Sequence, residues 1–309
     1  MKRFCFWLAL LFFYDRLLGA ALDANYRYVR WGECGGKLQY YADNQSKFPL
    51  VVLGASRSLN GIDPACLSQS AYNLSHSAMD LSFNACAVSL LGRQGKLPKV
   101  IVLDVAPEYF FRPAESMRGY QRLYYYYGSD PLVTRYVQEG SRTAPLEFLF
   151  STRRYNGIVT ANLYAAVKTK KGERAVTGYE PLAPGPKDLE RLKASVQSGQ
   201  DTEKLDPAVE LRLIDFLDQC RLYGVRPVLV STPTFATVWG NIGKYRVATA
   251  RIRAIADHAK CPYLDYFSSA QPDLQSKDLW HDRLHLNSHG AEIFSKKLRT
   301  GLADFQLLL

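Results

Sequence analysis

The chain has 309 residues, of which 22% are charged, 47% hydrophobic and 13% aromatic, values typical of a folded globular protein. This composition excludes collagen, a pure coiled coil and a wholly disordered chain. The length suits two domains of about 150 residues, or one α/β domain with a large insertion. Lys and Arg total 39 against 29 Asp and Glu, a net charge of +10, which favours anionic partners such as nucleic acid, phospholipid or acidic polysaccharide.

The N-terminus has the pattern of an export signal. Lys2 and Arg3 precede an apolar and aromatic run over residues 4–14, which matches a charged n-region followed by a short h-region. Asp15 and Arg16 interrupt the run before apolar residues resume. The first run is too short to cross a bilayer alone, since a span needs about 20 apolar residues.

Three interpretations of residues 1–24 therefore stay open: a cleaved signal peptide, a membrane anchor, or a buried helix of a cytoplasmic protein. If Lys2 and Arg3 stay inside, the positive-inside rule places the remaining chain outside the cytoplasm. We expect an exported protein in the periplasm or another extracytoplasmic space, either free or anchored to the inner membrane. Residues 25–309 are then the folded part.

The cysteines show no C-x-x-C pair and no spacing to histidine that binds zinc. We therefore expect no metal site, and most of these side chains should be buried small apolar residues. A disulfide is expected only if the domain is exported. The six positions are Cys5, Cys34, Cys66, Cys86, Cys220 and Cys261.

Apolar runs rich in β-branched residues alternate with helical patterns along the chain. Such runs are typical of parallel strands buried on both faces. The predicted strands are residues 49–53, 72–74, 99–105, 226–231 and 262–265, and the predicted helices are about 78–92, 209–220, 252–256 and 288–302. This alternation predicts a three-layer α/β/α sandwich with a parallel sheet.

Residues 107–206 break the alternation and are interpreted as a large insertion, which in a compact domain is usually a lid or a binding surface. The insertion contains tyrosines 124–127, Arg153 and Arg154, and ends in the Pro- and Gly-rich run 181–186. These side chains suit stacking on sugar rings and pairing with anionic groups, or packing as the core of a subdomain. Nucleic-acid binding also uses such residues, but the secretory N-terminus argues against that partner.

Ser56 follows a predicted strand in the run Gly54-Ala55-Ser56. In an open α/β sheet the carboxyl ends of the strands form the ligand crevice, so Ser56 is aimed at a site. A plain turn or a helix N-cap is the competing interpretation.

Asp282 and His285 are three residues apart before the last predicted helix. This spacing lets the carboxylate contact Nδ1 while Nε2 points outward, as a general base for a serine requires. A histidine can take up and return a proton near neutral pH. A capping Asp and a surface His are the alternative, and the flanking His281 and His289 are expected to be structural.

Taken together, the two ends of the chain resemble the SGNH (GDSL-like) hydrolase family. Its first block is Gly-x-Ser after the first strand and its last block is Asp-x-x-His before the C-terminal helix, and Ser56, Asp282 and His285 stand at those positions. The resemblance runs from about residue 49 to the end, excluding the insertion. It implies a flavodoxin-like α/β/α fold with a Ser-His-Asp triad, and the closer likeness is to exported bacterial members with an apolar N-terminal anchor.

The same resemblance implies an oxyanion hole, which this chain matches less well. The family uses the backbone N–H of the nucleophile, a glycine of the second block and an asparagine of the third. Ser75 stands where that glycine is common, and no Gly-x-Asn-Asp follows the strand that ends near residue 105. We expect Asn73, Ser75 and Arg57 to supply oxyanion or substrate contacts, or a group from the insertion to do so.

The sequence thus predicts a serine esterase acting on O-acyl groups, O-acetyl being favoured, of a cell-envelope or extracellular saccharide, or on a small ester, without any cofactor. An O-acyltransferase that modifies an exopolysaccharide is one alternative, because water and a sugar hydroxyl compete for the same acyl-enzyme. A non-catalytic glycan-binding or assembly protein with a decayed site is the other, motivated by the missing third-block asparagine.

Overall fold

The computed structural model describes residues 2–29, 36–111, 119–170, 177–184, 204–235, 242–268 and 271–307. Contacts divide the chain into two compact units. Unit 1 comprises Met1–Asp43 and Arg118–Ala175, and unit 2 comprises Asn44–Met117 and Val176–Leu309. Unit 1 thus combines the N-terminal segment with part of the 107–206 stretch, while the rest of that stretch belongs to unit 2.

Unit 2 is built on a five-stranded sheet in the order β2-β1-β3-β4-β5, with every pair of neighbours parallel. The strands are β1 (Leu50–Leu53), β2 (Ala71–Asn73), β3 (Val100–Asp104), β4 (Arg226–Ser231) and β5 (Tyr263–Asp265). The predicted strands and the parallel α/β class are confirmed. The chain turns outward from β1 to β2 and then returns to β3 on the other side, so the order reverses between β1 and β3, where such sheets bind ligands.

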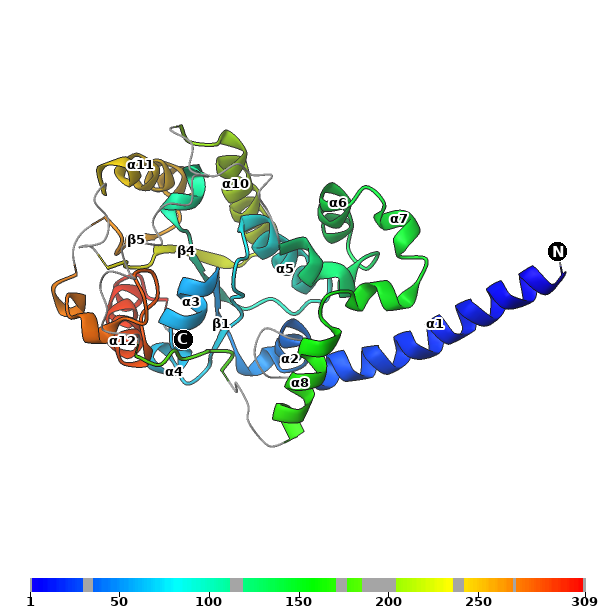
Figure 1. Ribbon diagram of the computed structural model, residues 1–309. Helices are drawn as coiled ribbons and strands as arrows, with labels where there is room; N and C mark the ends of the chain where they lie inside the picture. Colours follow the sequence, from blue (N-terminus) through cyan, green and yellow to red (C-terminus); the bar gives the residue numbers. More distant parts are fainter. Residues whose placement is uncertain are drawn as a thin grey trace. The chain divides into compact units, whose positions relative to one another are not determined.

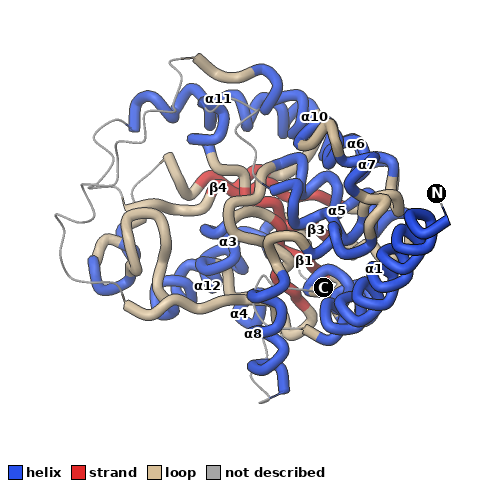
Figure 2. The backbone as a smooth tube through the Cα atoms, turned by 45° about the vertical axis from the view of Figure 1, so that its right-hand side comes forward, coloured by secondary structure: helices blue, strands red, loops and turns tan. Residues whose placement is uncertain are grey.

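Helices cover both faces of this sheet, as Figures 1 and 2 show. The described helices of unit 2 are α3 (Ser56–Gly61), α4 (Pro64–Leu67), α5 (Leu81–Arg93), α10 (Pro207–Leu222), α11 (Ile242–His258) and α12 (Ser288–Asp304). Short 3₁₀ turns lie at η1 (Gln45–Lys47), η2 (Pro107–Phe111), η7 (Pro272–Leu274) and η8 (Lys277–Leu279). Alternate strand residues such as Val52, Val102 and Val230 pack with Phe294 and Leu298 of α12 in one buried cluster. Since side chains alternate across a strand, the intervening residues face α5 and α10.

Unit 1 is helical and rich in aromatic contacts. Its described elements are α1 (Lys2–Tyr28), α2 (Lys37–Asp43), η4 (Gly119–Tyr126), α6 (Pro131–Gly140), α7 (Ala144–Glu147), η5 (Ser151–Tyr155) and α8 (Val159–Lys170). Tyr124 and Tyr126 are buried, the Arg153 guanidinium lies 4.7 Å from the centre of the Tyr124 ring, and Arg154 donates to the carbonyls of Tyr125 and Tyr127. These tyrosines and arginines therefore contribute to the packing of unit 1.

The cysteines follow the expectation of burial in part. Cys86, Cys220 and Cys261 are buried, Cys66 is half-buried and Cys5 is exposed, and all five are free thiols. Burial raises the pKa of the Cys220 and Cys261 thiols to about 12, so these two groups remain protonated and inert. Cys34 lies outside the described residues.

Candidate active site

The end of β1 brings Ser56 to the carboxyl edge of the sheet. Gly54 is needed there because a Cβ at this position would lie 2.8 Å from Cβ of Asp104, on the neighbouring strand β3. Ala55 is in an extended conformation and caps α3, so the helix begins at Ser56. The Ser56 side chain is consequently half-exposed at the point where the strand order reverses.

The loop before α12 presents His285 to this serine. Asp282 Oδ1 accepts hydrogen bonds from the backbone N–H groups of Leu284 and His285, at 2.7 and 2.9 Å, which closes a tight turn. Asp282 Oδ2 lies 2.8 Å from His285 Nδ1, and His285 Nε2 lies 2.8 Å from Ser56 Oγ. Three residues that the sequence separates by 229 positions at most thus form one continuous hydrogen-bonded chain.

The direction of these bonds follows from the chemistry of the groups. A carboxylate can only accept, so Nδ1 of His285 carries its hydrogen toward Asp282. In the neutral imidazole Nε2 is then the acceptor for the Ser56 hydroxyl. Partial burial raises the pKa of Asp282, but the hydrogen bond and charge of His285 and the two backbone N–H donors lower it more, to about 2. Asp282 is therefore ionised at neutral pH.

The segment 177–184, which we call the strap, forms hydrogen bonds to β2, to α3 and to the start of α12. Its residues bond to β2 through Thr177 O and Asn73 N at 2.8 Å, and to α3 through Glu180 O and Asn60 Nδ2 at 2.8 Å. Farther along, Ser288 N donates to Leu182 O. The strap therefore connects the helix that carries Ser56 with the loop that carries His285.

The flanking histidines stay outside the hydrogen-bonded chain. His281 Nδ1 lies 2.8 Å from the Ala183 carbonyl of the strap, and His289 is exposed on the first turn of α12. Among the residues that the structure describes, no group of three or more His, Cys, Asp or Glu side chains is arranged to hold a metal ion.

The structure gives Asn73 and Ser75 a different role from the oxyanion contacts expected of them. Asn73 is fully buried, and its Nδ2 donates to the carbonyls of Ser58 and Ile62 at 2.8 and 2.9 Å. Its Oδ1 accepts the backbone N–H of Ser75 at 3.0 Å. Both amide hydrogens of Asn73 and the Ser75 N–H are thus committed to holding α3 against β2.

Arg57 also differs from the expected substrate contact, because its guanidinium is buried. Arg57 Nη1 lies 3.0 Å from Glu108 Oε1, and both side chains are 6% exposed. Desolvation lowers the pKa of Arg57, but the carboxylates of Glu108 and Asp104 raise it more, so the group stays charged. Glu108 stands in the segment after β3 where the family pattern has its third block.

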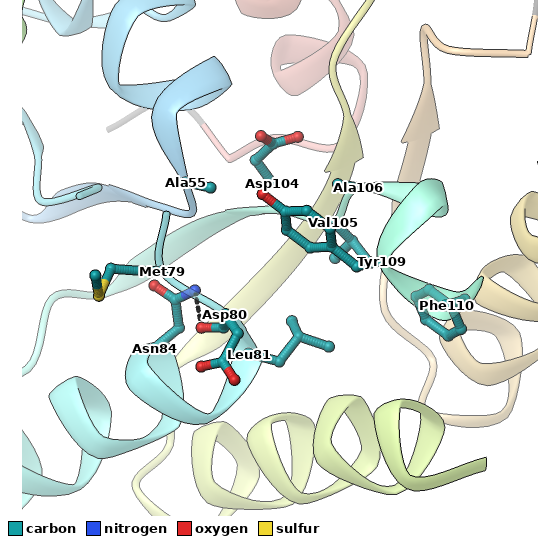
Figure 3. Close-up of a pocket in the computed structure, with 10 residues that line it drawn as sticks. All are labelled: Ala55, Met79, Asp80, Leu81, Asn84, Asp104, Val105, Ala106, Tyr109 and Phe110. Atoms are coloured by element: carbon teal, nitrogen blue, oxygen red, sulfur yellow. Dashed lines mark hydrogen bonds between the residues drawn. The ribbon is translucent and has the colours of Figure 1, made fainter. Parts of the chain in front are cut away.

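Asp104 completes this buried group at the end of β3. Its Oδ1 accepts the Thr232 N–H at 3.2 Å, and burial raises its pKa against the opposing effects of Arg57 and Thr232. Figure 3 shows the Tyr109 hydroxyl directed toward Asp104 at the edge of a small cavity lined also by Ala55 and Asn84. The cavity volume of about 10 Å³ gives room for about one water molecule and is too small for a substrate.

Sequence reasoning missed Glu108 and Asp104. Asp104 could have been found, because it ends a buried apolar run at the same sheet edge as Ser56. The partner of Arg57 gave no local signal, since nothing in Ala106-Pro107-Glu108 distinguishes a buried carboxylate from an exposed one.

Comparison with known proteins gives matches among solved structures. The chain is similar to a protein described as an acylhydrolase from Bacteroides fragilis, at 12% identity and a TM-score of 0.41 over 87% of this chain and 96% of that one. It is also similar to a GDSL-like lipase from Bacteroides thetaiotaomicron, at 10% identity and a TM-score of 0.41 over 87% and 98%. No family model matches, and no curated protein matches. We therefore argue the function from the site itself.

Proposed function

We propose that this protein is a serine esterase of the SGNH type, with Ser56 as nucleophile, His285 as general base and acid, and Asp282 as the group that orients His285. The observation that carries the proposal is the continuous chain of two 2.8 Å contacts from Ser56 Oγ through His285 to Asp282. Such a base–nucleophile contact with an orienting third group is the arrangement that activates a serine. A decayed binding site has no need to keep both contacts.

The reaction follows from these contacts. Ser56 Oγ attacks the carbonyl carbon of the ester while its proton passes to His285 Nε2. The tetrahedral intermediate collapses, and His285 returns the proton to the departing alkoxide oxygen, which leaves an acyl group on Ser56. Water then gives a proton to His285 and attacks the acyl carbonyl, and the carboxylic acid departs as Ser56 regains its hydrogen. Asp282 stabilises the imidazolium at each stage.

The proposed oxyanion donor is the backbone N–H of Ser56. It belongs to the first turn of α3, whose N–H groups have no acceptor within the helix. The side-chain amide of Asn73 is committed to backbone carbonyls, so we do not assign it to this task. A donor aimed at the developing oxyanion is worth on the order of 10²–10³ in rate.

We propose an O-acylated saccharide outside the cytoplasm as the substrate, with O-acetyl groups favoured. The support for export is the charged and apolar N-terminus, and the support for an envelope polymer is the net charge of +10, which attracts anionic polymers. Transfer of the acyl group to a sugar hydroxyl uses the same acyl-enzyme. Turnover of an aryl acetate with and without a glycan acceptor separates hydrolysis from transfer.

A fluorophosphonate tests the nucleophile without knowledge of the substrate. We expect peptide mapping of the treated full chain to show an adduct on Ser56, and the adduct to disappear in His285→Ala. The matched control is His289→Ala, an exposed histidine of the same segment, which should label like the wild type. A folded protein that gives no adduct on Ser56 contradicts the proposal and favours a binding function.

A further inference from the structure

The first half of α1 is apolar on every side. α1 is the described helix long and apolar enough to cross a membrane, with a mean hydropathy of 1.6 over its best 18-residue window and 11% of that window buried. Phe4, Trp7, Leu8, Leu11 and Phe13 are between 44% and 70% exposed. At 3.6 residues per turn these positions, together with the exposed Cys5, Phe6 and Ala9, lie all round the helix, a pattern typical of a helix surrounded by lipid.

Asp15 is the exception in this helix, and unit 1 satisfies it completely. It is 8% exposed, and its Oδ2 accepts the Ser151 N–H at 2.6 Å. Its Oδ1 accepts the Thr152 N–H at 3.1 Å and the Thr152 hydroxyl at 2.7 Å. A carboxylate with three donors no longer needs water, so this charge does not exclude α1 from a low-dielectric environment.

Neighbouring contacts fix the same face of α1 to the same segment. Arg16 donates to the Leu149 carbonyl at 2.6 Å and to Ser151 Oγ, and the rings of Phe12 and Phe150 stack at 5.1 Å. A signal peptide removed near residue 20 would take all of these partners away and leave the Ser151 and Thr152 N–H groups without an acceptor. The segment over 149–152 thus contacts α1 through a charged pair of residues and a stacked ring.

Exposed leucines surround this docking point. Leu17 and Leu18 of α1 are 59% and 54% exposed, and Leu146 and Leu149 are 71% and 53% exposed. Leu18 and Leu146 line one open groove together with Phe150. We call the four leucines the apolar rim.

We infer that α1 is a retained membrane helix and that unit 1 docks on the bilayer through the apolar rim. Residues 2–14 rise about 20 Å at 1.5 Å per residue, which is about 10 Å less than the hydrocarbon thickness. The part of α1 that follows residue 14, which carries Asp15 and lies beside the apolar rim, supplies the remaining thickness. Lys2 and Arg3 then lie at the opposite surface, where anionic headgroups attract them.

The first test uses the full chain, expressed with its own N-terminus and purified from membranes. We expect an intact mass that includes α1, and the protein is then reconstituted in vesicles of phosphatidylethanolamine and phosphatidylglycerol. A photoreactive phenylalanine analogue in place of Leu149 should form lipid adducts, as it should in place of Leu8. The same analogue in place of Arg135, which is 68% exposed on α6, should form none.

Two outcomes overturn the inference. One is a mature chain that begins after residue 20, and the other is a lipid adduct at position 8 without one at position 149. The intact mass is measured on the wild-type chain, and the photoreactive analogue replaces only leucines that are 44% (Leu8) and 53% (Leu149) exposed, where a substitution perturbs the fold little. Neither involves ester turnover, so their result is independent of the function proposed for Ser56.

A matched pair of variants tests the docking contact. A Cβ at Gly19 would lie 2.5 Å from Cβ of Ser151, whereas Ala20 is exposed on the next position of the helix. Gly19→Leu and Ala20→Leu both raise the hydrophobicity of α1, Gly19→Leu by about one methyl group more. We expect both proteins to stay in the membrane, with lipid adducts at position 149 lost in Gly19→Leu and unchanged in Ala20→Leu. Equal adducts in both variants would show that docking does not involve this contact.

Discussion

Arg57 Nη1 and Glu108 Oε1 lie 3.0 Å apart, with both side chains 6% exposed, directly beside the serine that begins α3. The pair links the first turn of α3 to η2, the 3₁₀ turn that follows β3. A buried charge pair is costly to desolvate and seldom stabilises a fold more than apolar packing would. Its position next to Ser56 therefore points to the orientation of the nucleophile rather than to stability.

We predict that Glu108→Gln destabilises the protein by about 3–5 kcal/mol, because it leaves the Arg57 guanidinium buried without its carboxylate. Urea unfolding measures this change. The control is Glu139→Gln, which removes the partner of Arg135 in a surface pair 68% and 58% exposed and should cost less than about 1 kcal/mol.

The double variant Arg57→Met/Glu108→Leu separates orientation from stability. Replacing a buried pair with apolar residues of similar volume is often neutral or stabilising, so we expect most of the lost stability to return. If the pair orients Ser56, a fluorophosphonate should label Ser56 more slowly in Glu108→Gln than in the wild type. The double variant should label as slowly as Glu108→Gln, although its stability has returned. A double variant that labels at the wild-type rate contradicts the positioning role.

Gly178 combines a left-handed backbone conformation with a close approach to β2, and the two together exclude a side chain. Its φ is +72°, and a Cβ there would meet the backbone oxygen of Asn73 and, at 2.9 Å, Cζ of Tyr72. We predict that Gly178→Ala displaces the strap, destabilises unit 2 and slows the labelling of Ser56. Gly224→Ala is the matched control, because Gly224 has a φ of +68° with nothing within 4 Å of an added Cβ.

The comparison of the two alanine variants isolates the steric clash. Both variants carry the cost of a left-handed backbone, about 1 kcal/mol, so the excess destabilisation of Gly178→Ala measures the contact with Asn73. If the two variants unfold at the same urea concentration and label equally fast, the strap does not hold the site.

Much of the architecture of unit 2 was predictable because its signals are local. Apolar strands and amphipathic helices alternate in the sequence, and the alternation itself implies parallel order. Ser56 was placed by the end of β1, and Asp282 and His285 by their mutual spacing. What brings them within 2.8 Å is the sheet, which sets the carboxyl end of β1 beside the loop before α12.

The roles of Asp15 and Asn73 could not be predicted, because they depend on partners in other elements of the fold. Asp15 looks like an interruption of an apolar helix until Ser151 and Thr152 are placed beside it. Asn73 looks like a candidate oxyanion donor until its amide is found on the carbonyls of Ser58 and Ile62. Periodicity carries no information about such contacts, since each joins residues from different elements.

Ser56→Ala and His285→Ala are each predicted to lower ester turnover by about 10⁴-fold or more. The urea midpoint should change little in Ser56→Ala, whereas His285→Ala also removes the partner of Asp282 Oδ2 and should lower it. The double variant should be no slower than either single variant, since residues that act as one unit are not additive. Steady-state turnover of an aryl acetate checks this. Losses that multiply in the double variant would show that the two residues act separately.

Asp282 gives a prediction about pH with a defined sign. Its pKa is about 2 in the folded protein, against an ordinary value of 3.8, so ionised Asp282 stabilises the fold above about pH 4 and this contribution is lost as the pH falls toward 2. The unfolding free energy of the wild type should therefore exceed that of Asp282→Asn above about pH 4, and the excess should decrease as the pH falls toward 2. Urea unfolding at a series of pH values measures the slope of the difference.

Asp104 provides the opposite case in the same molecule. Burial raises its pKa above the ordinary value of 3.8, so from pH 3.8 upward the unfolded chain releases this proton before the folded protein does. Wild type therefore loses stability with rising pH relative to Asp104→Asn, whereas relative to Asp282→Asn it gains stability between about pH 2 and 4. If both differences change in the same direction, the electrostatic roles assigned to the two carboxylates are wrong, since one is held charged by His285 and the other is penalised by burial.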